Sequence, residues 1–191
     1  QSYLLIPGMC RPARRVSLPV EGARILGIAM ADGLPYGDSV LVLEDRLSFL
    51  EVASLGGVDG FRRLPSGGYE IRCPWLADAV RRGPISLLEL DWRSLGTAVS
   101  EMVLRLGRED HLSGEIVIFG DDEWLAQLAI CPSFAGIIVS RIGDGFISVL
   151  RESVEACAAR AVGGFDGAPA PVVAPSKPPT ALAAQASTLS L

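Results

Sequence analysis

Two groups of carboxylates have the residue types and spacing best suited to metal binding or acid–base catalysis. Asp121, Asp122 and Glu123 are adjacent and could together supply oxygen ligands to Mg²⁺ or Ca²⁺. Glu89 and Asp91 lie two residues apart in a strand-like run, so they would share one face and could bind a metal ion or act as acid and base. A hairpin turn explains the first group more simply, and the solvent-facing side of a strand explains the second. We therefore predict no catalytic, cofactor-binding or metal-binding residue, and no cofactor.

The single histidine, His111, does not indicate a site either. It follows Glu109 and Asp110, but no further ligand lies at a spacing typical of zinc sites. A serine triad would need His111 as its base, and the chain has no G-x-S-x-G motif to present the serine. An exposed loop histidine is the simpler interpretation.

Lysine and cysteine usage excludes further classes of protein. Lys177, the only lysine, lies in a stretch rich in proline and alanine, so the lysine-dependent sites of P-loop NTPases and Schiff-base enzymes are not expected. The four cysteines, Cys10, Cys73, Cys131 and Cys157, form no C-x-x-C pair. We interpret them as buried thiols of a reducing compartment, which favours a cytoplasmic protein.

Charge and hydropathy limit the expected partners. The formal net charge is −5, and the basic residues are scattered in isolated pairs such as Arg62–Arg63 and Arg81–Arg82. We expect no nucleic-acid partner, because phosphate binding needs clustered positive charge. The chain has no apolar run of about 18 residues and no signal peptide, so membrane insertion is not expected either. Its start at Gln1 instead of methionine is typical of a processed chain or a fragment.

Short apolar runs separated by glycine, proline and aspartate predict a mainly β fold with two or three helices, with α+β as the alternative. The clearest hairpin has Glu115–Phe119 and Trp124–Ile130 as strands around Gly120–Glu123. Strands this short and closely spaced are typical of one or two small barrels or a sandwich. The other predicted strands are residues 3–6, 15–20, 24–30, 39–43, 47–52, 69–73, 85–92 and 136–140, and the predicted helices are residues 74–82, 97–106 and 147–162.

The composition divides the chain into two parts. Residues 1–162 are expected to form one β-rich globular domain, with two small barrel halves as an alternative, the second beginning near residue 115. Residues 163–191 are rich in proline and alanine and are expected to form a disordered tail or linker.

Several segments together resemble the CheW-like chemotaxis coupling domains. Tyr3–Ile6 and Val16–Val20 are similar to the two opening strands of that family, the second with a Leu-Pro step. Ile85–Gly96 resembles its later segment, which has Leu-Asp and Leu-Gly steps. Glu115–Gly120 is similar to the start of its second half, and Asp144–Leu150 to its closing strand. The resemblance implies two packed barrels and a non-enzymatic adaptor that joins a receptor to a histidine kinase.

Three functions follow from these observations. The first is a non-enzymatic protein–protein interaction module, such as a CheW-like adaptor between a receptor and a kinase. The alternative is an immunity-type protein that binds and neutralises a toxin, because an acidic surface attracts basic toxin sites. The third is a carboxylate-dependent enzyme that would use Glu89, Asp91 or the Asp121 group. A mean hydropathy of +0.37 is compatible with an apolar contact surface or with a well-filled core.

Overall fold

The described part of the protein contains the same sequence of helices and strands twice, and each occurrence is called a copy below. The computed structural model describes residues 15–44 and 46–163. Each copy runs α-β-β-α-β-β-α, and a 3-10 helix, η1 (Pro84–Glu89), connects the two. The first copy contains α1 (Val20–Asp32), β1 (Leu34–Tyr36), β2 (Ser39–Val42), α2 (Phe49–Ala53), β3 (Gly60–Arg63), β4 (Tyr69–Arg72) and α3 (Pro74–Arg82). The second contains α4 (Trp92–Leu106), β5 (Arg108–Asp110), β6 (Glu115–Phe119), α5 (Asp122–Ala135), β7 (Val139–Gly143), β8 (Phe146–Leu150) and α6 (Arg151–Gly163).

This architecture corrects the predicted fold class. The described residues form six α-helices and two separate four-stranded antiparallel sheets, so the prediction of a mainly β fold built from barrels or a sandwich is wrong. The predicted strands at 24–30 and 124–130 lie in α1 and α5, and most of the one at 47–52 lies in α2. The predicted helix at 147–162 begins as strand β8 and becomes α6 only at Arg151. None of the described helices is long and apolar enough to cross a membrane.

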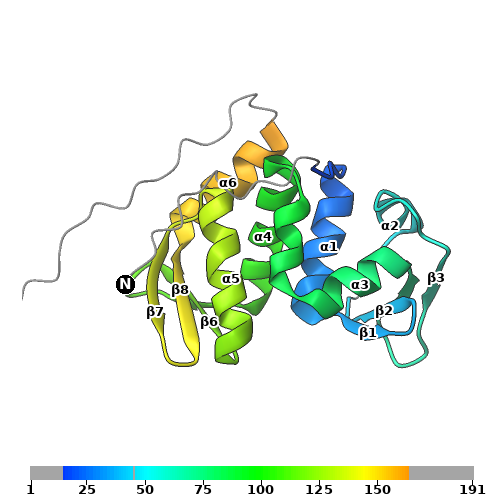
Figure 1. The fold of residues 1–191 in the computed structure, drawn as a ribbon, viewed down its shortest axis with the longest axis horizontal. Coiled ribbons are helices and arrows are strands. Elements are labelled where there is room, and N and C mark those ends of the chain that lie inside the picture. The colour runs from blue at the N-terminus through cyan, green and yellow to red at the C-terminus, as the bar shows by residue number, and fades with distance from the viewer. Residues whose placement is uncertain (1–14, 45, 164–191) are drawn as a thin grey trace, which may run out of the picture.

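Both sheets have the same strand order, which is β1-β2-β4-β3 in the first copy and β5-β6-β8-β7 in the second. In the first sheet, Val40 pairs with Ile71, and Ile71 pairs with Phe61, so these side chains share the face that packs into the core. In the second sheet, the pair Ile118 and Ile147 has the same role. Figure 1 shows the two sheets at opposite ends of the molecule, with α1 and α4 between them.

Helices α1 and α4 join the two copies by a close contact between their backbones. A methyl group added at Gly27 of α1 would lie 2.4 Å from the carbonyl oxygen of Ala98 and 2.9 Å from Cβ of Glu101, both on α4. Each copy therefore packs its own first helix against the first helix of the other. Contact between equivalent elements is the signature of an approximate two-fold axis.

Two glycines at equivalent positions show which residues of the two copies correspond. Gly33 ends α1 and Gly107 ends α4, both with extended backbone (φ −76° and −82°), and the first strand of each copy follows at once. A side chain at either position would collide with the last turn of its own helix and with a core side chain, Val40 or Ile116. By this alignment Asp32 in the first copy corresponds to Leu106 in the second.

Local sequence signals explain the helices that were predicted correctly. Pro74 occupies the first turn of α3, and Gly83 ends it at φ +78°, a conformation that favours glycine, so the predicted helix at 74–82 is confirmed. The side chain of Asp91 caps α4 by accepting a hydrogen bond from the Ser94 N–H at 2.8 Å, so this helix begins five residues before the predicted start at Thr97. The predicted strand at residues 3–6, Cys10, Lys177 and the predicted tail from residue 164 onward lie outside the described residues.

Candidate functional site

Asp121, Asp122 and Glu123 lie at the start of a helix and not at a hairpin turn. Asp121 caps α5 and accepts a hydrogen bond from the Trp124 N–H at 2.9 Å. The Asp122 carboxylate accepts from the Gly145 N–H at 3.0 Å. Carboxylates in the first turn of a helix are favoured because the N-terminal end carries partial positive charge. The three residues therefore have a structural explanation as the start of α5.

Glu89 and Asp91 do not share a strand face. Glu89 ends η1 and forms an ion pair with Arg82 at 2.5 Å, whereas Asp91 caps α4. Burial raises the pKa of the Asp91 carboxyl, but hydrogen bonds from Ser94 and Ser17 outweigh this effect and hold the pKa below its usual value. The two carboxylates thus have separate partners in the structure.

No metal-ligating group is assembled within residues 15–44 and 46–163, where no three histidine, cysteine, aspartate or glutamate side chains are placed to hold a metal ion. His111 is exposed, with Nδ1 3.6 Å from the Glu109 carboxylate. The prediction of buried thiols is confirmed for Cys73, Cys131 and Cys157, and burial raises the pKa of the Cys131 thiol to about 12. A thiol with so high a pKa is a weak nucleophile at neutral pH.

The junction of the two copies contains a charge network that the sequence did not reveal. Arg105 of α4 binds Asp32 at the end of α1 at 2.9 Å and Glu101 of its own helix at 3.1 Å, and it also pairs with Glu44 after β2. Burial raises the pKa of the Glu101 carboxyl, and the nearby Arg24 guanidinium offsets this only in part. A single guanidinium therefore links three carboxylates and connects the first copy to the second.

One face of the first sheet is not covered by helices. Cross-strand register places the following residues on this open face: Leu34, Tyr36, Ser39, Leu41, Arg62, Glu70 and Arg72. Arg62 and Arg72 are exposed, as is Tyr36. Glu70 accepts a hydrogen bond from the Ser39 hydroxyl at 2.9 Å and forms an ion pair with Arg62 at 2.5 Å. Arg72 has no salt bridge to another described residue.

The second sheet has an equivalent open face. It carries Arg108, Asp110, Glu115, Val117, Phe119, Arg141, Phe146, Ser148 and Leu150. Arg141 donates to the Glu115 carboxylate at 3.0 Å, so this face, like the first, has an arginine of its edge strand paired with a carboxylate. Arg108 is exposed and has no salt bridge to another described residue. The Ser148 hydroxyl is buried and lacks a hydrogen-bond partner within the described part of the chain.

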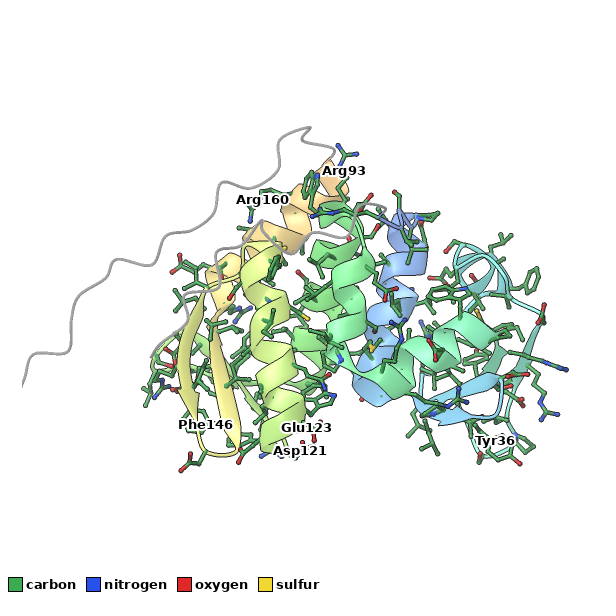
Figure 2. All side chains as sticks on the ribbon, in the orientation of Figure 1. Tyr36, Arg93, Asp121, Glu123, Phe146 and Arg160 are labelled. Atoms are coloured by element: carbon green, nitrogen blue, oxygen red, sulfur yellow. The ribbon has the colours of Figure 1, made fainter. Side chains whose placement is uncertain are left out.

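The charge on these two faces differs from that of the chain as a whole. The open faces carry four arginines (62, 72, 108 and 141) against three carboxylates (70, 110 and 115), a balance of +1, whereas the chain carries −5. Figure 2 shows Tyr36 of the first sheet and Phe146 of the second toward the lower side of the view, and Arg93 and Arg160 at its top.

Comparison with known proteins gave matches among solved structures only. A crystal structure of an I-DmoI variant in complex with its target DNA and manganese matches with 12% identity and a TM-score of 0.45, covering 76% of this chain and 96% of that chain. I-DmoI in complex with DNA and calcium matches with 14% identity and a TM-score of 0.44, covering 71% and 87%. Mesophilic variants of I-DmoI, described as a homing endonuclease, match with 12% identity and a TM-score of 0.45, covering 75% and 96%. No family model and no curated protein matches the chain, so neither comparison tests the CheW-like resemblance.

These matches contradict several predictions from the sequence. The matched structures are of a homing endonuclease, several of them in complex with DNA. The predictions of a non-enzymatic adaptor with a role in chemotaxis, of an immunity-type protein, and of a chain with no nucleic-acid partner disagree with these matched structures and are withdrawn. At 12–14% identity and TM-scores below 0.5 the likeness assigns no role to any residue of this chain.

Sequence reasoning missed the open sheet faces because their residues come from eight short strands. The signal that could have located them is period-two alternation, such as Tyr69, Glu70, Ile71 and Arg72, where buried and solvated side chains alternate. That pattern is present in β4 and β6, both of which were predicted as strands. Their pairing partners could not be inferred, because the neighbouring α1 and α5 were taken for strands.

Proposed function

We propose that the protein binds duplex nucleic acid with the open faces of its two sheets. The observation that carries the proposal is that each of the two equivalent sheets leaves one face free of helices and places two arginines on it. Sheets are established readers of nucleic-acid grooves, and a protein two-fold axis matches the symmetry of a duplex.

The three described cysteines are all free thiols, which supports a location in the reducing cytoplasm.

Local charge and not net charge decides whether phosphates can bind. Arg72 and Arg108 are exposed, lie on different sheets and have no described carboxylate in a salt bridge with them, so their guanidinium groups are available to phosphates. Arg62 and Arg141 are each paired with a carboxylate and would contribute less. In the view of Figure 2, Asp121 and Glu123 lie between Tyr36 and Phe146. These carboxylates would repel phosphates, so binding should be moderate, and its salt dependence should reflect the small number of arginine–phosphate contacts.

Replacing Arg72 and Arg108 together by glutamine should weaken binding and flatten its salt dependence. Each phosphate contact contributes about 0.9 to the slope of log K against log salt, so loss of both should reduce the slope by about 2. The measurement is fluorescence anisotropy of a labelled duplex of mixed sequence, titrated with the full chain between about 50 and 200 mM salt.

A matched control separates this effect from that of net charge. The double variant Arg93→Gln and Arg160→Gln also removes two positive charges, but these residues lie at the top of the view in Figure 2, whereas Tyr36 and Phe146 of the two sheets lie toward its lower side. We expect this control to retain the wild-type slope. Equal loss of affinity in both double variants, or no salt-dependent binding by the wild-type chain, would show that the sheets are not the binding surface.

A further inference from the structure

A cavity of about 470 Å³ lies in the first copy, next to the point where the described chain begins. Its walls come from α1, α3, η1, the segment after α2 and residues 16–18. The larger apolar side chains of the lining are those of Val16, Leu18, Leu26, Leu55, Trp75 and Leu90. The volume falls in the range of sites that enclose a ligand, so the cavity has room for more than one apolar side chain.

The polar groups of the lining already have partners within the protein. The Trp75 indole N–H donates to the Gly56 carbonyl at 2.8 Å, and the Ser86 hydroxyl donates to the Gly83 carbonyl at 2.8 Å. Arg82, at the rim, pairs with Asp78 at 3.0 Å and with Glu89 at 2.5 Å. A small polar ligand would find few groups to orient it, whereas apolar side chains would bury their surface without leaving a hydrogen bond unmade.

The first described residues of the chain lie beside this cavity. Val16 lines the cavity and is held by two backbone hydrogen bonds, from its own N–H to the Glu89 carbonyl and from the Asp91 N–H to its carbonyl, each 2.9 Å long. Tyr3–Ile6, a run of four apolar residues, ends ten residues before Val16 and is followed by a Pro-Gly pair typical of a turn. A ten-residue connection has an average reach on the order of 17 Å, enough to return this run to the cavity.

The charge at the rim of the cavity is complementary to the charge of residues 1–14. Asp78 and Glu89 at the rim face one arginine, Arg82, which leaves one net negative charge. Residues 1–14 contain Arg11 and Arg14 and no acidic residue. We propose that Tyr3–Ile6 docks in this cavity, with the two arginines that follow it near the acidic rim. This inference is independent of nucleic-acid binding.

Disulfide trapping in the full chain tests the docking. Leu5→Cys is combined with Ala79→Cys in the cavity wall, with Cys10→Ser to remove a competing thiol, and the disulfide is quantified by mass spectrometry after mild oxidation. The control pairs Leu5→Cys with Glu21→Cys, which is exposed in the first turn of α1 and only a few residues from Val16. Because Ala79 is only 5% exposed, a cysteine there reacts only with a thiol inside the cavity. Docking predicts on the order of tenfold more cross-link at position 79 than at position 21; an equal or lower yield at position 79 overturns it.

A second measurement does not depend on introduced cysteines. Leu4→Asp with Leu5→Asp should empty the cavity, so an environment-sensitive apolar dye should bind this variant several-fold more tightly than the wild-type chain. Both changes lie outside the described residues, and the variant keeps every packing contact between residues that the structure describes. A wild-type chain that binds the dye as tightly as the variant would show a cavity open to free ligands and would overturn the proposal.

Discussion

Replacing Gly27 by alanine is expected to lower the free energy of unfolding by about 2–3 kcal/mol, a typical cost of overpacking a close contact. The new methyl group would lie 2.4 Å from the Ala98 carbonyl oxygen, and this backbone atom cannot move without displacing α4. Helix propensity alone favours alanine over glycine by about 1 kcal/mol, so the expected sign is opposite to that of an unpacked helix. Urea denaturation followed by circular dichroism gives the measurement.

Gly163→Ala is the matched control for this change. Gly163 is the last residue of α6, and nothing lies within 4 Å of the position its Cβ would occupy. We expect this variant to stay within about 0.5 kcal/mol of the wild type. If Gly27→Ala were as stable as Gly163→Ala, the close approach of α1 and α4 would not be what holds the two copies together.

Arg105→Met should also destabilise the protein, by about 2 kcal/mol at pH 7. The side chains of Arg105, Glu44 and Glu101 are only 21–24% exposed, and Asp32 is 35% exposed, so removal of the guanidinium leaves three partly buried carboxylates without their shared cation. The loss of a fully buried pair costs about 3–5 kcal/mol and that of an exposed pair about 0–1, and this network lies between those cases. Thermal and urea unfolding at fixed pH measure the difference.

The pH dependence of Arg105→Met supplies an independent check. Burial raises the pKa of the Glu101 carboxyl in the folded protein. The protonated carboxyl therefore stabilises the fold fully at pH values below the pKa of the unfolded chain. This stabilisation is lost as the pH rises through the folded-state pKa. Without Arg105 this loss should be larger. The difference in the free energy of unfolding between variant and wild type should therefore widen between pH 4 and pH 7. Arg151→Met is the control, because Arg151 also binds two carboxylates but is 47% exposed. A gap that is independent of pH, or equal to that of Arg151→Met, would contradict the role of the network.

The sequence predicts some elements well because their local signals are unambiguous. Pro74 and Gly83 mark both ends of α3, and the apolar positions of α4 follow the helical period. Glu115–Phe119 has the alternation of a half-buried strand, and it is β6. In these cases local propensity and tertiary packing favour the same structure.

The central helix α1 could not be predicted in the same way. Every residue from Gly22 to Met30 except Arg24 is buried, so the segment has no polar face from which to read a helical period. Such an apolar run cannot be distinguished from a buried strand by periodicity alone. Gly22 separates two of the predicted strands and Gly27 lies inside one of them, although their role is to let Ser54 and α4 approach α1 closely. With α1 taken for a strand, its pairing with α4 and the two-fold arrangement could not be seen.

The candidate site was missed for a different reason. Net charge led to the exclusion of nucleic acid, because −5 is an average over surfaces that differ. Arg72 and Arg108 are 36 positions apart in the chain and only strand pairing places them on equivalent open faces. The acidic run Asp121–Glu123 looked like a turn because aspartate is common both at turns and at helix caps, and only the structure distinguishes the two.

Arginine footprinting in the presence of duplex nucleic acid tests the central claim most directly. A dicarbonyl reagent modifies exposed arginines, and mass spectrometry reads each site with and without a bound duplex at low salt. The proposal predicts that Arg72 on the first sheet and Arg108 on the second are protected together, while Arg160 on α6 reacts as in the free protein. Protection of Arg160 with continued reaction of Arg72 and Arg108, or no change at any site while the duplex is bound, would contradict binding by the two sheets.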